Sequence, residues 1–460
     1  MEGITMRKIV TKLAALALCI SMCAMPVYAA DTGLASYVTP EMCSAQYWID
    51  RTPNAYDVVM TAEEIASLNQ RIANTGETHV KDLSSVDPVF DGVKLAGELA
   101  SFETPSARYI AGQLVPDWYY DILRYNISSA NVSEKMYVKY GFVVNQTVMK
   151  SYPYREYLSD AAGDVEWDDM ANAGLNVNEP VLVYFYTGDS GFAYVESSFC
   201  TGWVPAEDIA ICKDKSQWEK VKNAQDILVV TGEKVYLEAG LTDPDLSEKM
   251  MMMGTVLPLA PDKDGKITGR LSWNNYVVLM PARDESGYFV QKRALIPANR
   301  DVHVGYLSYT TANVLTQAFK ALGNRYGWGG SLYASDCSGY IQNIYRCFGL
   351  KIARNTTWQG AMPVAVASLD GLNTDQKAAL LACDVPAGSI LQFRGHEMLY
   401  LGCVDGKYYT INDVSSLVDP EDASLEVIRP RSVVVNDMST KRGSGVTWLE
   451  TMDKIIMIRQ

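Results

Sequence analysis

The periodicity of apolar residues changes near residue 306, and this change constrains the fold more than any other feature of the sequence. Between about residues 136 and 300, apolar and polar residues alternate in short runs such as 180–186, separated by turn signals such as Thr187-Gly-Asp-Ser-Gly. From residue 308 onward two helical stripes come first, over 311–322 and 337–348, and alternating strands follow Pro386. Two compact all-β modules followed by one helix-first α+β domain are therefore predicted.

These patterns divide the 460 residues into five parts. A chain of this length is too long for one core, so several domains are expected. One helix before the β modules is clearly marked, because Thr61 can cap it, Glu64 follows three residues later, and the next apolar residues form one stripe. The predicted parts are a signal peptide (1–29), an N-terminal helical segment (30–135), the two β modules (136–215 and 216–305) and the α+β domain (306–460).

The N-terminus has the composition of a secretory signal. Arg7, Lys8 and Lys12 precede an apolar run over 13–25, and small residues follow at Ala29 and Ala30. This order is typical of a cleaved signal peptide, and the run is too short to span a bilayer. We therefore expect an exported protein, secreted or associated with the cell wall, that has no stable membrane span.

Charge and cysteine content exclude several classes of function. The formal net charge of −14 argues against a nucleic-acid partner. Seven cysteines follow the signal segment, an odd number that leaves at least one thiol unpaired. With three histidines in the whole chain and no Cys-x-x-Cys pair, neither a metal site nor a cofactor is expected. We expect a monomer.

The segment from Gly323 to Gln342 carries the strongest chemical signal. A glycine-rich loop leads into Asp336-Cys337-Ser338-Gly339 and then into a helix. The free N–H groups at a helix start stabilise a thiolate and lower its pKa, and they can also hold a developing oxyanion. Asp336 is the predicted helix cap and Cys337 the predicted nucleophile.

A nucleophilic thiol needs a base, and His396 is the only histidine within the same predicted domain as Cys337 and its helix. It begins an apolar strand that turns back at Asp405-Gly406. A strict two-residue hairpin would place Asp413 on the His396 face, whereas a three-residue loop with a bulge would place Asn412 there. The sequence pattern leaves both residues open as the partner that orients the imidazole.

These motifs resemble the NlpC-type cell-wall cysteine peptidases. The matching segments are Tyr326-Gly-Trp-Gly-Gly, Asp336-Cys-Ser-Gly, Arg354-Asn-Thr-Thr-Trp-Gln and Gly395-His396, and Gly202-Trp-Val-Pro resembles the bacterial SH3-like modules of the multidomain members. The resemblance implies an N-terminal clip segment, two SH3-like barrels and a papain-like α+β peptidase domain. It also implies that Cys337, His396 and Asn412 form the catalytic triad and that Tyr326 lines the oxyanion hole.

The resemblance further implies a substrate. Members of the family hydrolyse peptidoglycan stem peptides, typically between γ-D-glutamate and the diamino acid, and here Ser338, Trp328, Arg354 and Asn355 would line the subsites. Members specific for a free N-terminal L-alanine usually carry Asp at position 355, and the Asn355 amide brings no charge, which removes about 1–3 kcal/mol of charge-assisted binding. An amidase or acyltransferase using the same thiol and a catalytically silent wall-binding protein are the alternatives.

Overall fold

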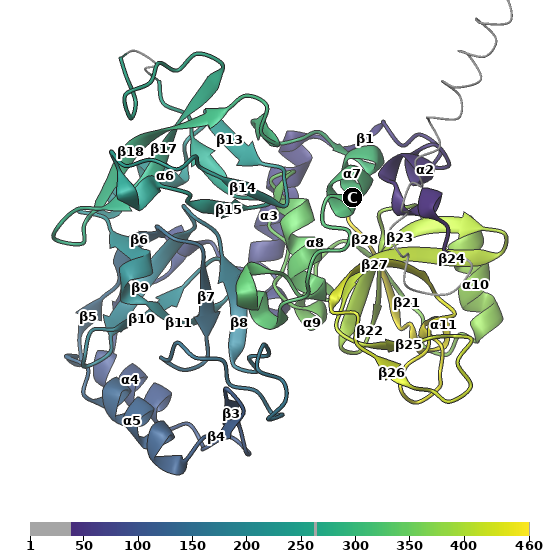
Figure 1. The fold of residues 1–460 in the computed structure, drawn as a ribbon, viewed down its shortest axis with the longest axis horizontal. Coiled ribbons are helices and arrows are strands. Elements are labelled where there is room, and N and C mark those ends of the chain that lie inside the picture. Colours follow the sequence, from purple (N-terminus) through teal and green to yellow (C-terminus); the bar gives the residue numbers. More distant parts are fainter. Residues whose placement is uncertain (1–37, 262–264, 460) are drawn as a thin grey trace, which may run out of the picture.

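The computed structural model describes residues 38–261 and 265–459, so the predicted signal peptide (1–29) lies outside the described residues. The two β modules lie on one side of the molecule and the six-stranded sheet of the C-terminal domain on the other, with α8 between them (Figure 1). No helix within the described ranges is long and apolar enough to cross a membrane. The multidomain α+β class predicted from the sequence is confirmed.

The first β module is one antiparallel sheet of seven strands in the order β12-β6-β9-β10-β11-β7-β8. Its buried face is formed by alternating apolar residues, among them Val143, Val183 and Val195, as the period of two requires. The strands are β6 (Lys139–Val143), β7 (Thr147–Lys150), β8 (Ala171–Leu175), β9 (Pro180–Tyr186), β10 (Phe192–Glu196), β11 (Thr201–Pro205) and β12 (Ile209–Ile211), with the short η4 (Ala206–Asp208) before the last.

Two helices pack on the face of the middle strands of this module, opposite its core. Ile127 and Ala96 pack against Phe185 and Trp203 of the sheet. The elements are η3 (Leu83–Ser85), β2 (Val89–Phe90), α4 (Gly92–Ala100), β3 (Tyr109–Ile110), β4 (Gln113–Leu114), α5 (Asp117–Ser128) and β5 (Met136–Tyr137), which pairs with β2.

The second β module consists of three small antiparallel sheets around one core that contains Leu228, Val278 and Met280. The polar stretch before it is a helix, because Asp214 caps it and buried Trp218 anchors it. The elements are α6 (Lys215–Lys222), β13 (Ile227–Val230), β14 (Lys234–Tyr236), η5 (Pro244–Leu246), β15 (Met250–Met252), β16 (Val256–Pro258), β17 (Asn275–Arg283), β18 (Phe289–Pro297) and β19 (Val302–Val304).

The C-terminal domain packs helices α7 and α8 against a six-stranded sheet in the order β21-β28-β22-β23-β24-β27. Ile341 and Ile344 of α8 meet Leu399 and Ile411 of the sheet in the largest core. The elements are β20 (Tyr309–Thr310), α7 (Thr311–Phe319), η6 (Trp328–Tyr333), α8 (Cys337–Arg346), α9 (Thr356–Gln359), β21 (Ala365–Ser368), α10 (Thr374–Cys383), β22 (Ile390–Phe393), β23 (His396–Val404), β24 (Lys407–Val414), β25 (Leu417–Val418), β26 (Val427–Ile428), β27 (Ser432–Asp437), α11 (Trp448–Thr451) and β28 (Lys454–Met457).

The first part of the N-terminal segment, residues 38–80, belongs to the core of this C-terminal domain. Strand β1 pairs with β20, and Trp48 packs on Tyr409 with ring centroids 5.3 Å apart. The predicted helix capped by Thr61 is confirmed, including the reciprocal bonds between Thr61 and Glu64. The elements are η1 (Pro40–Cys43), α2 (Ala45–Ile49), β1 (Val58–Met60), α3 (Ala62–Ala73) and η2 (Gly76–Thr78). Residues far apart in sequence therefore complete one core.

Replacing Trp48 tests this assignment. Trp48 is 1% exposed and its Nε1 donates to the Met42 carbonyl oxygen at 2.7 Å. Because Trp48→Ala leaves a large cavity, we expect it to lower the free energy of unfolding of the C-terminal domain by about 3–5 kcal/mol in urea denaturation. Trp273, which is 77% exposed, is the matched control. Trp273→Ala should change stability by less than about 0.5 kcal/mol, and equal effects of the two substitutions would contradict the packing described.

Candidate active site

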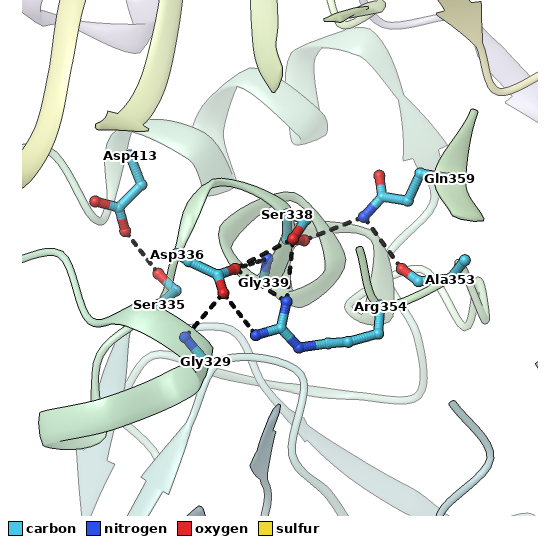
Figure 2. Close-up of polar contacts among 9 residues, drawn as sticks. All are labelled: Gly329, Ser335, Asp336, Ser338, Gly339, Ala353, Arg354, Gln359 and Asp413. Carbon is cyan, nitrogen blue, oxygen red and sulfur yellow. Dashed lines mark hydrogen bonds and ion pairs between the residues drawn. The ribbon is translucent and has the colours of Figure 1, made fainter. Parts of the chain in front are cut away.

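The start of α8 is held by a buried carboxylate. Asp336 Oδ1 accepts a hydrogen bond from the Gly339 backbone N–H at 2.8 Å, and Oδ2 accepts from the Gly329 N–H at 3.0 Å (Figure 2). The first bond caps the helix as predicted, and the second ties the glycine-rich loop to the same residue. One side chain therefore fixes both the loop and the helix on either side of Cys337.

Arg354 pairs with this carboxylate. Its two terminal nitrogens reach Asp336 Oδ1 at 3.0 Å and Oδ2 at 2.7 Å, and one of them also reaches Ser338 Oγ at 3.0 Å (Figure 2). Burial alone would raise the pKa of Asp336, but the guanidinium and the N–H donors hold it below the ordinary value. Arg354 and Ser338 were predicted to line the substrate subsites, and the structure buries both in the support of the helix start.

The Cys337 thiol is buried and electrostatically disfavoured as a thiolate. Its residue is 6% exposed. Burial raises its pKa well above the ordinary value, and the neighbouring carboxyls of Asp336, Glu397 and Asp413 add to the rise. The sequence predicted a lowered pKa from the helix N-terminus alone, and that expectation is wrong because burial and like charges outweigh the helix dipole. The resting thiol is therefore neutral.

His396 is oriented by Asn412. The imidazole Nε2 lies 3.0 Å from Asn412 Oδ1, and Asn412 Nδ2 donates to Asn436 Oδ1. Asn436 uses its own Nδ2 to donate to Thr440 Oγ1, so this chain of amides fixes Asn412 Oδ1 as the acceptor. Nε2 consequently carries the proton, and Nδ1 is the nitrogen with a free lone pair.

The surroundings keep the imidazole neutral. Burial lowers the pKa of His396 to about 4, an effect that the Asn412 bond opposes and the nearby Arg442 reinforces. The ring packs against Phe393 and Trp448, with centroids 5.5 and 5.1 Å away. Because the pKa lies below neutrality, His396 is available as a proton acceptor at pH 7.

The hairpin between β23 and β24 explains why Asn412 and not Asp413 meets His396. The turn is the two-residue one, since Val404 pairs with Lys407, but a bulge between Tyr400 and Gly402 shifts the register farther along the strands. The bulge reverses the parity that a regular two-residue hairpin would give. Asp413 therefore points to the other face of the sheet, where it accepts a hydrogen bond from Ser335 Oγ at 2.9 Å (Figure 2).

Cys337 and His396 lie on opposite faces of β23, with the backbone of that strand between them. The Cys337 sulfur lies against the backbone N–H of Glu397, on the face of β23 that Asp413 shares, whereas the imidazole of His396 packs against Phe393 and Trp448 on the other face. No hydrogen bond joins the thiol to His396 in the part of the chain that the structure describes. The thiol and the imidazole are therefore not in contact within the described residues.

Glu397 is a neighbour that the sequence analysis missed. Its side chain is fully buried, one oxygen accepts from Gln392 Nε2 at 3.0 Å, and Oε1 has no hydrogen-bond partner among the described residues. Burial raises the pKa of this carboxyl to about 8. A glutamate inside the apolar run Met398-Leu-Tyr-Leu was the available signal.

The first β module covers the site. Trp167, in the loop before β8, stacks on Tyr326 with centroids 5.8 Å apart and an interplanar angle of 5°, and it also stacks on Trp328 at 5.5 Å. Tyr326 is 7% exposed and Trp328 40%, so Trp328 lies at the rim. Ion pairs of Arg325 with Glu166 and of Arg431 with Asp164 fasten the loop.

The glycine-rich loop makes this close approach possible. Gly329 and Gly330 have φ of 61° and 88°, and a Cβ on either would lie 2.2 Å from Ala171 O or 2.4 Å from Gly174 N. No residue with a side chain fits there without moving β8. The loop predicted from the sequence to lead into the helix is therefore also the contact with the first β module.

Asn355 caps α9. Its Oδ1 accepts from the Trp358 backbone N–H at 3.0 Å, so the side chain is engaged with its own helix. Beside it, His79 of the N-terminal segment stacks on Trp358 at 4.3 Å. Within the described residues no group of three or more His, Cys, Asp or Glu is placed to hold a metal ion.

Comparison with known families gives two matches. Residues 156–205 match the SH3 domain of SH3b1 type, and residues 323–427 match the NlpC/P60 family. The second match contains Tyr326, Cys337, His396 and Asn412. No curated protein sequence matches the chain.

Two solved structures are similar to this chain. An NlpC/P60 endopeptidase from Photobacterium damselae subsp. piscicida superposes with a TM-score of 0.70 at 15% identity, covering 90% of this chain and 96% of its own. An NlpC/P60 family protein from Bacillus cereus ATCC 10987 has a TM-score of 0.46 at 16% identity, covering 70% of this chain and 100% of its own. The first likeness shows that the whole arrangement of domains is shared.

The pH dependence of the Cys337 thiol tests the role of Glu397. Below pH 8 the Glu397 carboxyl is neutral, and above it the carboxylate opposes ionisation of the adjacent thiol. In Glu397→Gln that charge never forms, so we expect the pKa of Cys337 to fall by about one unit, with alkylation roughly tenfold faster at pH 9. Mass spectrometry of the Cys337 peptide after iodoacetamide treatment measures this rate separately from the exposed thiols.

The exposed Glu421 provides the control. Glu421→Gln changes the net charge equally but lies outside the site, so its Cys337 alkylation profile should match the wild type. Identical profiles for Glu397→Gln and the wild type would show that Glu397 does not act on the thiol.

Proposed function

We propose that this protein is a secreted cysteine peptidase that hydrolyses peptidoglycan stem peptides. Residues 323–427 match the NlpC/P60 family, which is a family of cell-wall peptidases, and an SH3b-type domain precedes them. The observation that supports this proposal most is the position of Cys337 at the start of α8, beside the strand that carries the His396–Asn412 pair. The proposed bond is the one between γ-D-glutamate and the following diamino acid.

The proposed reaction begins from a neutral thiol and a neutral imidazole. In the proposed reaction His396, paired with Asn412 through Nε2–H, is the base that takes the proton of Cys337 as sulfur attacks the amide carbonyl, and this step requires the imidazole to reach the Cys337 face of β23. The oxyanion is held by the Cys337 backbone N–H and by Tyr326, whose pKa burial raises well above its ordinary value, so that it stays a hydrogen-bond donor. The imidazolium then protonates the leaving amine, and water hydrolyses the thioester.

Trp167 and its loop, which cover the site, favour small substrates. Trp167 covers one face of Tyr326, and the ion pairs of its loop close the approach from the first β module. A cross-linked glycan strand is too wide to enter a narrow site, whereas a free stem peptide can enter it by one end. We therefore propose that the enzyme acts on released stem peptides in preference to intact wall.

Substitution of Cys337 tests the chemistry. With free L-Ala-γ-D-Glu-diamino acid tripeptide as substrate, we expect Cys337→Ser to lower the rate of release of the diamino acid by at least about a thousandfold, while circular dichroism stays unchanged. Cys383, an exposed thiol of the same domain, is the matched control, and Cys383→Ser should keep full activity.

Release of the diamino acid by the Cys337→Ser variant would refute the assignment, and a folded wild type that binds the tripeptide without cleaving it would indicate a wall-binding protein. Transfer to an added amine in place of hydrolysis would indicate an acyltransferase.

Truncation of Trp167 tests the proposed preference for small substrates. We expect Trp167→Ala to raise the ratio of cleavage in intact sacculi to cleavage of free tripeptide by about tenfold, because the truncation removes a side chain that limits access. Trp118, on α5 and 60% exposed, is the control, and Trp118→Ala should leave the ratio unchanged. A wild type that already cleaves sacculi as fast as free peptide would contradict the proposed preference.

A further inference from the structure

A cavity lies between the two β modules, away from Cys337. Its volume is about 650 Å³, and none of its described lining residues belongs to the C-terminal domain. The modules meet here through a bridge of Ile211 with Tyr288, and Arg283 of β17 donates to the carbonyl oxygens of Ala206 and Ile209 in the first module. The cavity is therefore part of the joint between the modules.

The charge of this cavity is opposite to that of the protein. The whole chain carries 54 acidic and 40 basic residues. Four cations, Lys139, Lys213, Lys215 and Arg283, line the cavity, whereas Asp214 is the one carboxylate among its described lining residues. Such a local reversal concentrates anions against the overall field.

The nearby carboxylates are already engaged. Asp214 caps α6 by accepting from the Gln217 N–H at 2.8 Å. Asp284, just outside the lining, accepts from the Ser286 and Tyr288 N–H groups at 2.9 Å each. Lys215 reaches Ser84 O at 3.0 Å and forms an ion pair with Glu219.

Three of the four cations have no carboxylate partner among the described residues, and of these Arg283 donates to carbonyl oxygens instead. Among the described residues, Lys139 and Lys213 form no ion pair, and the Lys139 ammonium lies 5.4 Å above the Tyr186 ring. Tyr140 and Tyr288 add further rings to the wall, the latter 48% exposed. Exposed aromatic rings beside polar groups suit the apolar faces of sugars and polyols.

We propose that this cavity binds an anionic group, a phosphate or a carboxylate, carried on a sugar or polyol chain. Lys139, Lys213 and Arg283 would contact the anion, and the tyrosines would pack on the chain that carries it. A ligand bound across the joint would hold the protein on anionic wall material by residues that take no part in hydrolysis.

Binding to two defined probes tests the proposal. A short glycerol-phosphate oligomer supplies phosphates, and a soluble disaccharide-peptide fragment of peptidoglycan supplies carboxylates without phosphate. We expect the full-length protein to bind at least one probe, with affinity that falls as salt rises, and the double variant Lys139→Glu, Lys213→Glu to bind that probe at least about tenfold more weakly. The probe that binds identifies the anion.

A control variant distinguishes the effect of the charge of the cavity from the effect of the net charge of the protein. A double variant with Lys94→Glu and Lys266→Glu, two exposed lysines outside the cavity, changes the net charge equally and should bind like the wild type. Binding of neither probe, or equal losses in the two double variants, would overturn the proposal. Both double variants should cleave free tripeptide at the wild-type rate, so failure here is distinguishable from failure of the proposed peptidase function.

Discussion

The buried pair of Asp336 and Arg354 is the interaction on which the rest of the site depends. Its carboxylate caps α8, holds the Gly329 N–H and accepts two guanidinium bonds, so the loop, the helix and the segment before α9 meet at one group. Taking two charges out of water is costly, and removing one partner of such a pair destabilises a fold by about 3–5 kcal/mol. The pair is therefore retained for geometry: it sets where Cys337 stands relative to the sheet.

That geometry has an electrostatic consequence for the thiol. Asp336 stays ionised because Arg354 faces it, while burial raises the pKa of both Glu397 and Asp413. The helix start would favour a thiolate, but the carboxyls and the lack of solvent oppose it. The thiol and the imidazole are thus both neutral at rest, and in the proposed reaction charge separates only when a substrate occupies the site. Water exclusion by Trp167 strengthens every interaction that the separated charges then make.

Local signals in the sequence were sufficient for two helix starts and for one strand. The Thr61 cap, the Asp336 cap and the alternation over 180–186 each rest on interactions within a few residues, and each is found in the structure. The face occupied by Asn412 was not predictable, because it depends on a bulge at Gly402, where φ is 140°. Trp167 was missed for a different reason: it reaches Tyr326 across more than 150 residues, and no local pattern encodes that contact.

The first β module therefore contributes directly to the surroundings of the site in the C-terminal domain. Strand β8 receives the backbone of Gly329 and Gly330, and the loop before it supplies the ring that covers Tyr326. At its other end, Lys139 and Ile211 form one wall of the cationic cavity. A rigid sheet joins these two ends, so the position of the C-terminal site relative to anything held in that cavity is set by the strands and not by a flexible linker. The proposed substrate range of the C-terminal site consequently rests on contacts from a domain that supplies none of the proposed catalytic residues.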